Sequence, residues 1–243
     1  MLTEQKNYSA DKSELFGHFY YNPAAEKKPA IIIAHAWYGL DAFAKQKAEY
    51  LASLGYVAFA ADVYGHNKLA KTDEEARALM GPLFLDRHVM QKRIIAAYDT
   101  VVQHAAVDAT RIGIIGFCFG GLVAIELLRS GTPIKGAVSF HGVLANEKEG
   151  HRAKTVPIAK GIKGSLLMLH GHDDPLVSQQ DILQIQTELT EAKVDWQMNI
   201  YGGTSHAFTN PEAHDIKNGL IYNKQTADRA WSAMRSFFSE IFA

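Results

Sequence analysis

Residues 116–121 spell GFCFGG, and they hold the only cysteine of a 243-residue chain. The residues before them, RIGII (111–115), are apolar and rich in β-branched side chains, which predicts a buried strand. The residues after them, LVAIELLRSG (122–131), have helical spacing and end in a glycine. Cys118 is therefore predicted to lie at a tight corner between a strand and a helix.

Such a corner strains the backbone, and only small residues fit two positions to either side of it. Gly116 and Gly120 fill both positions, so the segment matches the pattern glycine-x-nucleophile-x-glycine, with cysteine in place of serine. The helix N-terminus that follows favours a thiolate. The alternative is a buried structural cysteine, the commonest fate of a free cysteine. The flanking glycines favour a nucleophile.

A cysteine nucleophile needs a base, and the base needs a carboxylate that orients it. Around corners of this kind the chain order is nucleophile, acid, histidine. The segment SLLMLHGHDDPLV (165–177) contains a predicted strand followed by Asp173 and Asp174, and NIYGGTSHAF (199–208) supplies His206. We therefore predict a triad of Cys118, His206 and one of the two aspartates.

The rest of the chain alternates between short apolar runs and segments of helical spacing. The apolar runs are 15–21, 30–36, 56–63, 111–117, 135–142, 165–171 and 195–203, and the clearest helical segments are 42–55, 87–105 and 226–242. This alternation predicts an α/β fold, with a mainly parallel, doubly wound sheet and helices on both of its faces. We expect a single domain over residues 1–243. Residues 64–88 interrupt the alternation and predict an excursion near the strand ends, where open α/β sheets bind ligands.

Composition and charge narrow the possible partners. Charged residues make up 21% of the chain and the formal net charge is −1, which argues against a nucleic-acid-binding surface. A single cysteine cannot form an internal disulfide. The chain has no signal-peptide pattern at its start and no apolar run long enough to span a bilayer, so we expect a cytoplasmic protein without a membrane partner. We expect a monomer or a homodimer.

Five segments together make the chain resemble the dienelactone hydrolase family, and the resemblance covers nearly the whole sequence. They are AHAWYGL (34–40), ADVYG (61–65), GFCFGG (116–121), HGHDDPLV (170–177) and SHAF (205–208). The resemblance implies an α/β-hydrolase fold and hydrolysis of a small ester or lactone, with no metal or organic cofactor. It implies Asp174 as the acid, because the family's acid precedes two residues and a valine. It also implies that the backbone N–H groups of Trp37 and Phe119 form an oxyanion hole.

Two positions depart from the family's pattern. Ala36 stands where cysteine-type members carry a glutamate beside the thiol, and Asn210 stands where they carry an arginine that holds the substrate carboxylate. Arg77 is a candidate for a second carboxylate-binding arginine, and Tyr38 is a candidate for lining the substrate site. We therefore expect a site that accepts neutral substrates and does not require an anionic one.

Several alternatives remain open from the sequence. The chain could be a general carboxylesterase or thioesterase of the same fold, or a non-enzymatic member that binds a small molecule or senses redox state through its thiol. His35 could line the pocket or pack behind the oxyanion loop, His141 is interpreted as a structural histidine, and His170 could be a hydrogen-bonded core residue. HGHDD (170–174) resembles part of a metal-binding run, but no histidine closes it, and we predict no metal site.

Overall fold

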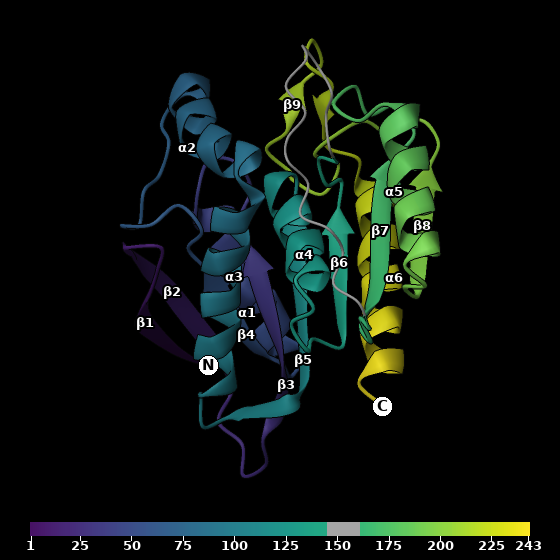
Figure 1. Ribbon diagram of the computed structural model, residues 1–243. Helices are drawn as coiled ribbons and strands as arrows, with labels where there is room; N and C mark the ends of the chain where they lie inside the picture. The colour runs from purple at the N-terminus through teal and green to yellow at the C-terminus, as the bar shows by residue number, and fades with distance from the viewer. Residues whose placement is uncertain (145–160) are drawn as a thin grey trace.

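The computed structural model describes residues 1–144 and 161–243. Within them an eight-stranded sheet forms the centre of the molecule (Figure 1). Its strands are β1 (Leu2–Ala10), β2 (Ser13–Tyr21), β3 (Lys28–Ala34), β4 (Val57–Ala61), β5 (Val107–Phe117), β6 (Gly136–Phe140), β7 (Ser165–Gly171) and β8 (Trp196–Tyr201). The helices are α1 (Ala42–Ser53), α2 (Asp73–Leu85), α3 (Arg87–Val102), α4 (Phe119–Arg129), α5 (Gln179–Glu191) and α6 (Lys224–Ile241). A small hairpin pairs β9 (His214–Asp215) with β10 (Leu220–Ile221).

The strand order in the sheet is β1-β2-β4-β3-β5-β6-β7-β8. In this order the strands from β4 to β8 are parallel. At one edge β2 pairs antiparallel with β4, and β1 pairs antiparallel with β2. The carboxyl ends of the parallel strands therefore share one edge of the sheet, which is uppermost in Figure 1. The predicted α/β fold with a mainly parallel sheet is confirmed.

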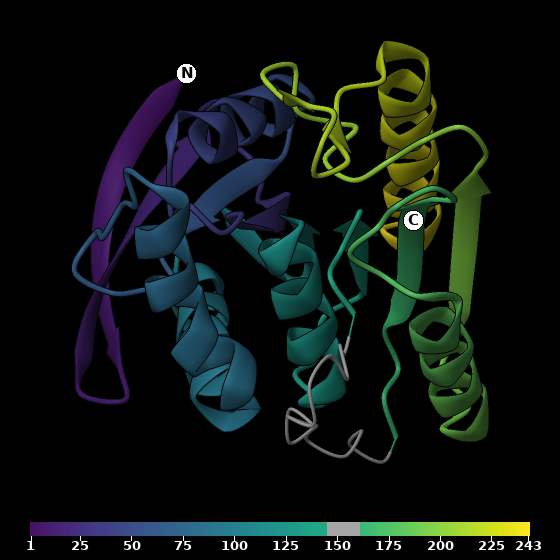
Figure 2. The same ribbon diagram turned by 90° about the horizontal axis from the view of Figure 1, so that it is seen from above.

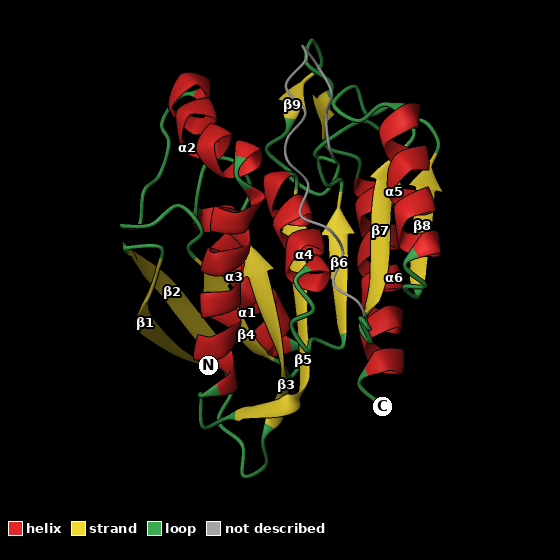
Figure 3. Ribbon diagram, in the orientation of Figure 1, coloured by secondary structure: helices red, strands yellow, loops and turns green. Residues whose placement is uncertain are grey.

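Helices cover both faces of the sheet, as Figure 2 shows from above and Figure 3 by secondary structure. Successive side chains of a strand point to opposite faces. Ile31 and Ile33 accordingly pack in the cluster that contains α1 and α6, whereas Ile32 packs in the cluster that contains α3, α4 and α5. Burial on both faces explains why the central strands are apolar at nearly every position.

All seven predicted apolar runs contain strands, and the three predicted helical segments form α1, α3 and α6. Four features had no prediction: the helices α2 and α5, the strand β1 and the β9–β10 hairpin. The strand β1 is mostly exposed and polar at the edge of the sheet, and the β9–β10 hairpin is only two residues deep on each side. Neither buries enough apolar surface to leave a periodic signal in the sequence.

The predicted excursion at 64–88 contains α2 and approaches the segment that follows β3. Thr72 caps the start of α2 by accepting a hydrogen bond from the Glu75 N–H. Ala70 N–H donates to the Tyr38 carbonyl at 2.9 Å, and Gly39 forms a bridge with Leu69. The excursion is therefore anchored at the carboxyl-end edge of the sheet. Of the described helices, none is long and apolar enough to cross a membrane.

Candidate active site

Cys118 lies at the corner between β5 and α4, at the carboxyl end of a central strand. Its backbone has φ 54° and ψ −117°, in the left-handed half of conformational space that residues other than glycine rarely adopt. The Cys118 N–H donates to the Phe140 carbonyl at 3.1 Å, which ties the corner to the end of β6. The thiol is free and half-buried. This is the backbone shape of a nucleophile elbow.

The glycines around this corner have the steric role that the sequence predicts. A Cβ atom on Gly116 would overlap the Gly120 carbonyl, and one on Gly120 would overlap the backbone at Ala34. A Cβ on Gly121 would lie 2.6 Å from the Cα of Gly142. Any side chain at these three positions would therefore push α4 away from the sheet and displace the corner.

Asp174 and His206, from the loops after β7 and β8, meet in a buried pair. The His206 Nδ1 lies 2.7 Å from the Asp174 Oδ2, and the side chains are 1% and 0% exposed, respectively. The second carboxylate oxygen, Oδ1, accepts a hydrogen bond from the Leu176 N–H at 2.9 Å. Both oxygens of Asp174 are thus held. Asp173 is exposed, and its N–H donates to the Thr204 carbonyl in the turn.

The charge of Cys118 raises the pKa of the His206 imidazole, whose second ring nitrogen is Nε2. Burial opposes the charged imidazole, but the negative charge of the Cys118 sulfur and the bond to Asp174 outweigh it and raise the pKa of His206 to about 10. Nε2 has no hydrogen bond of ordinary geometry to any described residue, so the sulfur acts mainly through its charge. Catalytic hydrogen bonds are often long before substrate binds. The structure thus brings all three predicted triad residues to one place.

The two predicted oxyanion donors follow the neighbouring strands β5 and β3 at the carboxyl-end edge of the sheet. Phe119 is the first residue of α4, where backbone N–H groups have no partner within the helix. Trp37 follows β3, and its carbonyl accepts a hydrogen bond from the Tyr64 hydroxyl at 2.8 Å. The Tyr64 ring also stacks on Phe119 at 5.7 Å. Tyr64 belongs to the segment ADVYG (61–65), but only the folded structure shows that it contacts both Trp37 and Phe119.

Two of the predicted substrate-binding residues, Tyr38 and Arg77, lie where the excursion meets the loop after β3, and the third, Asn210, lies in the loop after β8. Tyr38 donates its hydroxyl to the Asp73 Oδ1 at 2.5 Å, and Arg77 lies over the Trp37 ring at 5.8 Å with its side chain 67% exposed. The excursion thus brings Arg77 beside the oxyanion loop. Asn210 uses its side-chain oxygen within its own loop, where it accepts a hydrogen bond from the Glu212 N–H at 3.1 Å.

Three further histidines surround the site, and burial lowers the pKa of each. His141 donates to or accepts from the Thr209 hydroxyl at 2.8 Å, and its ring lies 5.0 Å from the His206 ring. His170 is buried at the end of β7. His35 bonds to the backbone on both sides of its ring. Within residues 1–144 and 161–243, no three His, Cys, Asp or Glu side chains gather as metal ligands.

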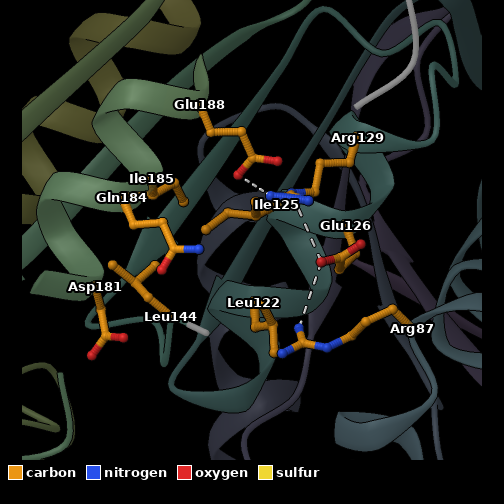
Figure 4. A pocket seen from close by; sticks show the side chains of 10 residues that line it. All are labelled: Arg87, Leu122, Ile125, Glu126, Arg129, Leu144, Asp181, Gln184, Ile185 and Glu188. Atoms are coloured by element: carbon orange, nitrogen blue, oxygen red, sulfur yellow. Dashed lines mark hydrogen bonds and ion pairs between the residues drawn. The ribbon is translucent and has the colours of Figure 1, made fainter. Parts of the chain in front are cut away.

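A cavity of about 140 Å³ lies along α4, beside α5 (Figure 4). Charged side chains line it, and their charges are paired with opposite charges or engaged by hydrogen bonds within the protein. Arg87 faces Glu126 at 3.5 Å, Arg129 pairs with Glu188, and Asp181 accepts hydrogen bonds from Ser178 at the start of α5. Because these charges are compensated by partners within the protein, we assign the cluster a role in joining α3, α4 and α5.

A strained cysteine corner at the carboxyl end of a parallel sheet, with a histidine–aspartate pair beside it, defines an α/β-hydrolase. The model of the dienelactone hydrolase family matches residues 16–242, and the chain belongs to that family.

Its relatives agree with this assignment. A Bradyrhizobium protein named "Probable 2-oxo-3-(5-oxofuran-2-ylidene)propanoate lactonase" is 29% identical over 183 residues, which cover 74% of this chain and 73% of that protein. The solved structure of m3DLH is 36% identical and superposes with a TM-score of 0.91, covering 100% of this chain and 99% of the other. A dienelactone hydrolase-like promiscuous phosphotriesterase from metagenomic libraries is 32% identical with a TM-score of 0.89, covering 99% and 98%.

Proposed function

We propose that this chain hydrolyses small esters or lactones, with Cys118 as the nucleophile, His206 as the base and Asp174 as the residue that orients His206. One observation carries the proposal: the free thiol of Cys118 lies at a strained strand-to-helix corner beside His206, whose Nδ1 is held by a buried carboxylate at 2.7 Å. Burying such charged groups costs free energy. A catalytic role accounts for that cost, and membership of a hydrolase family supports it.

In the proposed reaction the Cys118 sulfur attacks the carbonyl carbon of the substrate, and the carbonyl electrons move to the oxygen. When the tetrahedral intermediate collapses, the C–O bond to the leaving group breaks and the His206 imidazolium gives its proton to that oxygen. A thioacyl-enzyme remains. Neutral His206 then takes a proton from water, and the resulting hydroxide attacks the thioester carbonyl. The C–S bond breaks, the acid is released, and the Cys118 thiolate and the His206 imidazolium are restored.

The backbone N–H groups of Trp37 and Phe119 are the proposed donors to the oxyanion. Their value comes from being fixed before the reaction, so that no solvent has to reorganise as charge develops on the oxygen. Loss of one such donor lowers kcat by about 10²–10³-fold in serine hydrolases of comparable chemistry.

The proposal is tested by the burst of product from a chromogenic short-chain ester. We expect a burst of one product per free thiol, followed by a slower steady state, and neither in Cys118→Ala. Steady turnover by Cys118→Ala would contradict the proposal. The same assay with a thioester, a lactone and a phosphotriester compares three other substrate classes. Preference for the thioester would favour a general thioesterase, and turnover of the phosphotriester would match the activity named for the metagenomic relative. Ligand binding without turnover in any arm would favour the non-enzymatic alternative.

The pH behaviour of His206 should depend on Cys118. In the wild type the charge of Cys118 and the bond to Asp174 raise the pKa of His206 to about 10, against burial, which lowers it. Removing the thiolate leaves burial less opposed, so Cys118→Ala should lower the pKa of His206. NMR titration of the His206 ring, assigned with His206→Gln, measures both midpoints. An unchanged midpoint would mean that the sulfur and the ring do not interact.

Substrate charge should matter less than in family members that hold a substrate carboxylate with arginine. At position 210 an asparagine offers no charge and no bidentate fork, and its oxygen is engaged with Glu212. Each lost charge-assisted bond removes roughly 1.5–3 kcal/mol of binding, about one to two decades in affinity. We expect kcat/KM for a neutral ester to match or exceed that for its carboxylate-bearing analogue.

Arg77 is the residue that could reverse this expectation, because it lies over Trp37 with an exposed side chain. The same substrate pair is therefore measured in Arg77→Ala. A strong preference for the anion in the wild type that disappears in Arg77→Ala would overturn the prediction and assign the carboxylate to Arg77.

A further inference from the structure

The peptide unit between Ala36 and Trp37 is held from its carbonyl side. A trans peptide points its C=O and N–H in opposite directions, so whatever fixes the Ala36 carbonyl also aims the Trp37 N–H. The Ala36 carbonyl lies 2.7 Å from the His35 Nδ1 and also accepts a hydrogen bond from the Gly39 N–H at 3.1 Å. The proposed oxyanion donor therefore belongs to a peptide with two anchors on its other end.

The protonation of His35 follows from its partners. The Val63 N–H lies 3.1 Å from the His35 Nε2, and a backbone N–H can only donate. Nε2 must therefore be the unprotonated acceptor, and in the neutral ring the proton is on Nδ1, which donates to the Ala36 carbonyl. Burial lowers the pKa of His35, which keeps the ring neutral. Only one tautomer satisfies both contacts.

We propose that His35 is a positioning residue for the oxyanion hole: its Nδ1–H fixes the Ala36–Trp37 peptide and aims the Trp37 N–H at the developing oxyanion. The inference rests on the proposed hydrolytic function. His35 is 0% exposed, so it acts through this peptide and does not touch substrate. A hydrogen bond to the carbonyl also polarises the same peptide and strengthens its N–H as a donor.

The surroundings of His35 connect the two proposed donors. The Tyr64 hydroxyl holds the Trp37 carbonyl, and the Tyr64 ring packs edge-on against His35 with ring centres 4.6 Å apart. The Tyr64 ring also stacks on the ring of Phe119, whose backbone N–H is the second proposed donor. His35 and Tyr64 thus fix consecutive peptides of the loop and set its position relative to the start of α4.

His35 also joins β3 to the residues after β4 through Val63, so its structural and positioning roles must be separated. Two substitutions do this. The amide nitrogen of asparagine lies where Nδ1 lies and can donate to the Ala36 carbonyl, and the amide oxygen of glutamine lies where Nε2 lies and can accept from the Val63 N–H. We expect His35→Asn to keep the oxyanion peptide aimed and His35→Gln to release it.

The readouts are the burst rate with the chromogenic ester and the rate of Cys118 alkylation by iodoacetamide, a displacement that forms no oxyanion. In His35→Gln the burst rate should fall by about 10–100-fold, part of the loss that a missing donor causes. Alkylation should stay within about twofold of the wild type. His35→Asn should retain most of the burst rate.

Three results would overturn the inference. One is a burst rate in His35→Gln at or above that of His35→Asn. Another is parallel loss of burst and alkylation rates in both variants, which would indicate general distortion of the site. The third applies if His35→Gln does not fold while His35→Asn does, which would mean that the Val63 contact is dispensable for folding. The burst rate of His35→Asn then decides. A rate near that of the wild type supports the inference, and a large loss overturns it. Failure of the hydrolytic proposal itself is recognised separately, by ester turnover in Cys118→Ala.

Discussion

Replacing Asp174 by asparagine is expected to lower kcat for the best ester substrate by about 10⁴-fold, because an asparagine in this role selects the wrong histidine tautomer. The Asp174 Oδ2 accepts from His206 Nδ1 at 2.7 Å, which leaves Nε2 to face the thiol. An amide nitrogen at that place would donate to Nδ1 and move the ring proton to Nε2. The Leu176 N–H would still hold the remaining oxygen, so the fold should be retained.

The matched control is the neighbouring aspartate. Asp173 is exposed and holds the turn through its backbone N–H, which Asp173→Asn preserves. We expect its kcat to stay within about threefold of the wild type, as for a surface change away from the site. Both variants are first compared by thermal unfolding. A larger loss of kcat in Asp173→Asn than in Asp174→Asn would show that the other carboxylate orients His206.

The central sheet could be predicted from the sequence because its strands are buried on both faces. Runs such as AIIIAHA (30–36) and SLLMLHG (165–171) are apolar at successive positions for that reason. The strand β1, with the sequence LTEQKNYSA, could not be predicted in this way. Among the described residues it pairs with β2 alone, and it exposes most of its side chains and carries the polar residues that edge strands use to prevent unwanted pairing.

The candidate triad could also be predicted, since each residue follows a recognisable strand and the glycines around Cys118 are required by sterics. What the sequence could not provide is the direction of side chains that reach the site from other segments. The tautomer of His35 depends on Val63, and the approach of Arg77 to Trp37 depends on how α2 is anchored. Asn210 stands at the sequence position where family members carry an arginine, but its side-chain oxygen accepts a hydrogen bond from the Glu212 N–H within its own loop.

The buried pair of Arg87 and Glu126 joins two helices that no local sequence pattern connects. We expect Glu126→Ala to lower the free energy of unfolding by about 3–5 kcal/mol, because it leaves a buried guanidinium without its counter-charge. Arg87 is 1% exposed, its Nη1 lies 3.5 Å from Glu126, and its two terminal nitrogens have no hydrogen-bond partner among the described residues. Burial lowers the pKa of Arg87 to about 10, which reflects the cost of keeping this charge in the interior.

Urea denaturation of two comparison variants separates the unpaired charge from simple loss of packing. The double variant Arg87→Met/Glu126→Leu removes both charges and keeps apolar volume, so it should be more stable than Glu126→Ala alone, since well-packed apolar replacements of buried pairs are often neutral. Arg129 still has Glu188 in that variant. Glu188→Gln, on a side chain that is 32% exposed, should cost less than about 1 kcal/mol. If the double variant were less stable than Glu126→Ala, the pair would be stabilising in its own right, and the cost would not come from an unpaired charge.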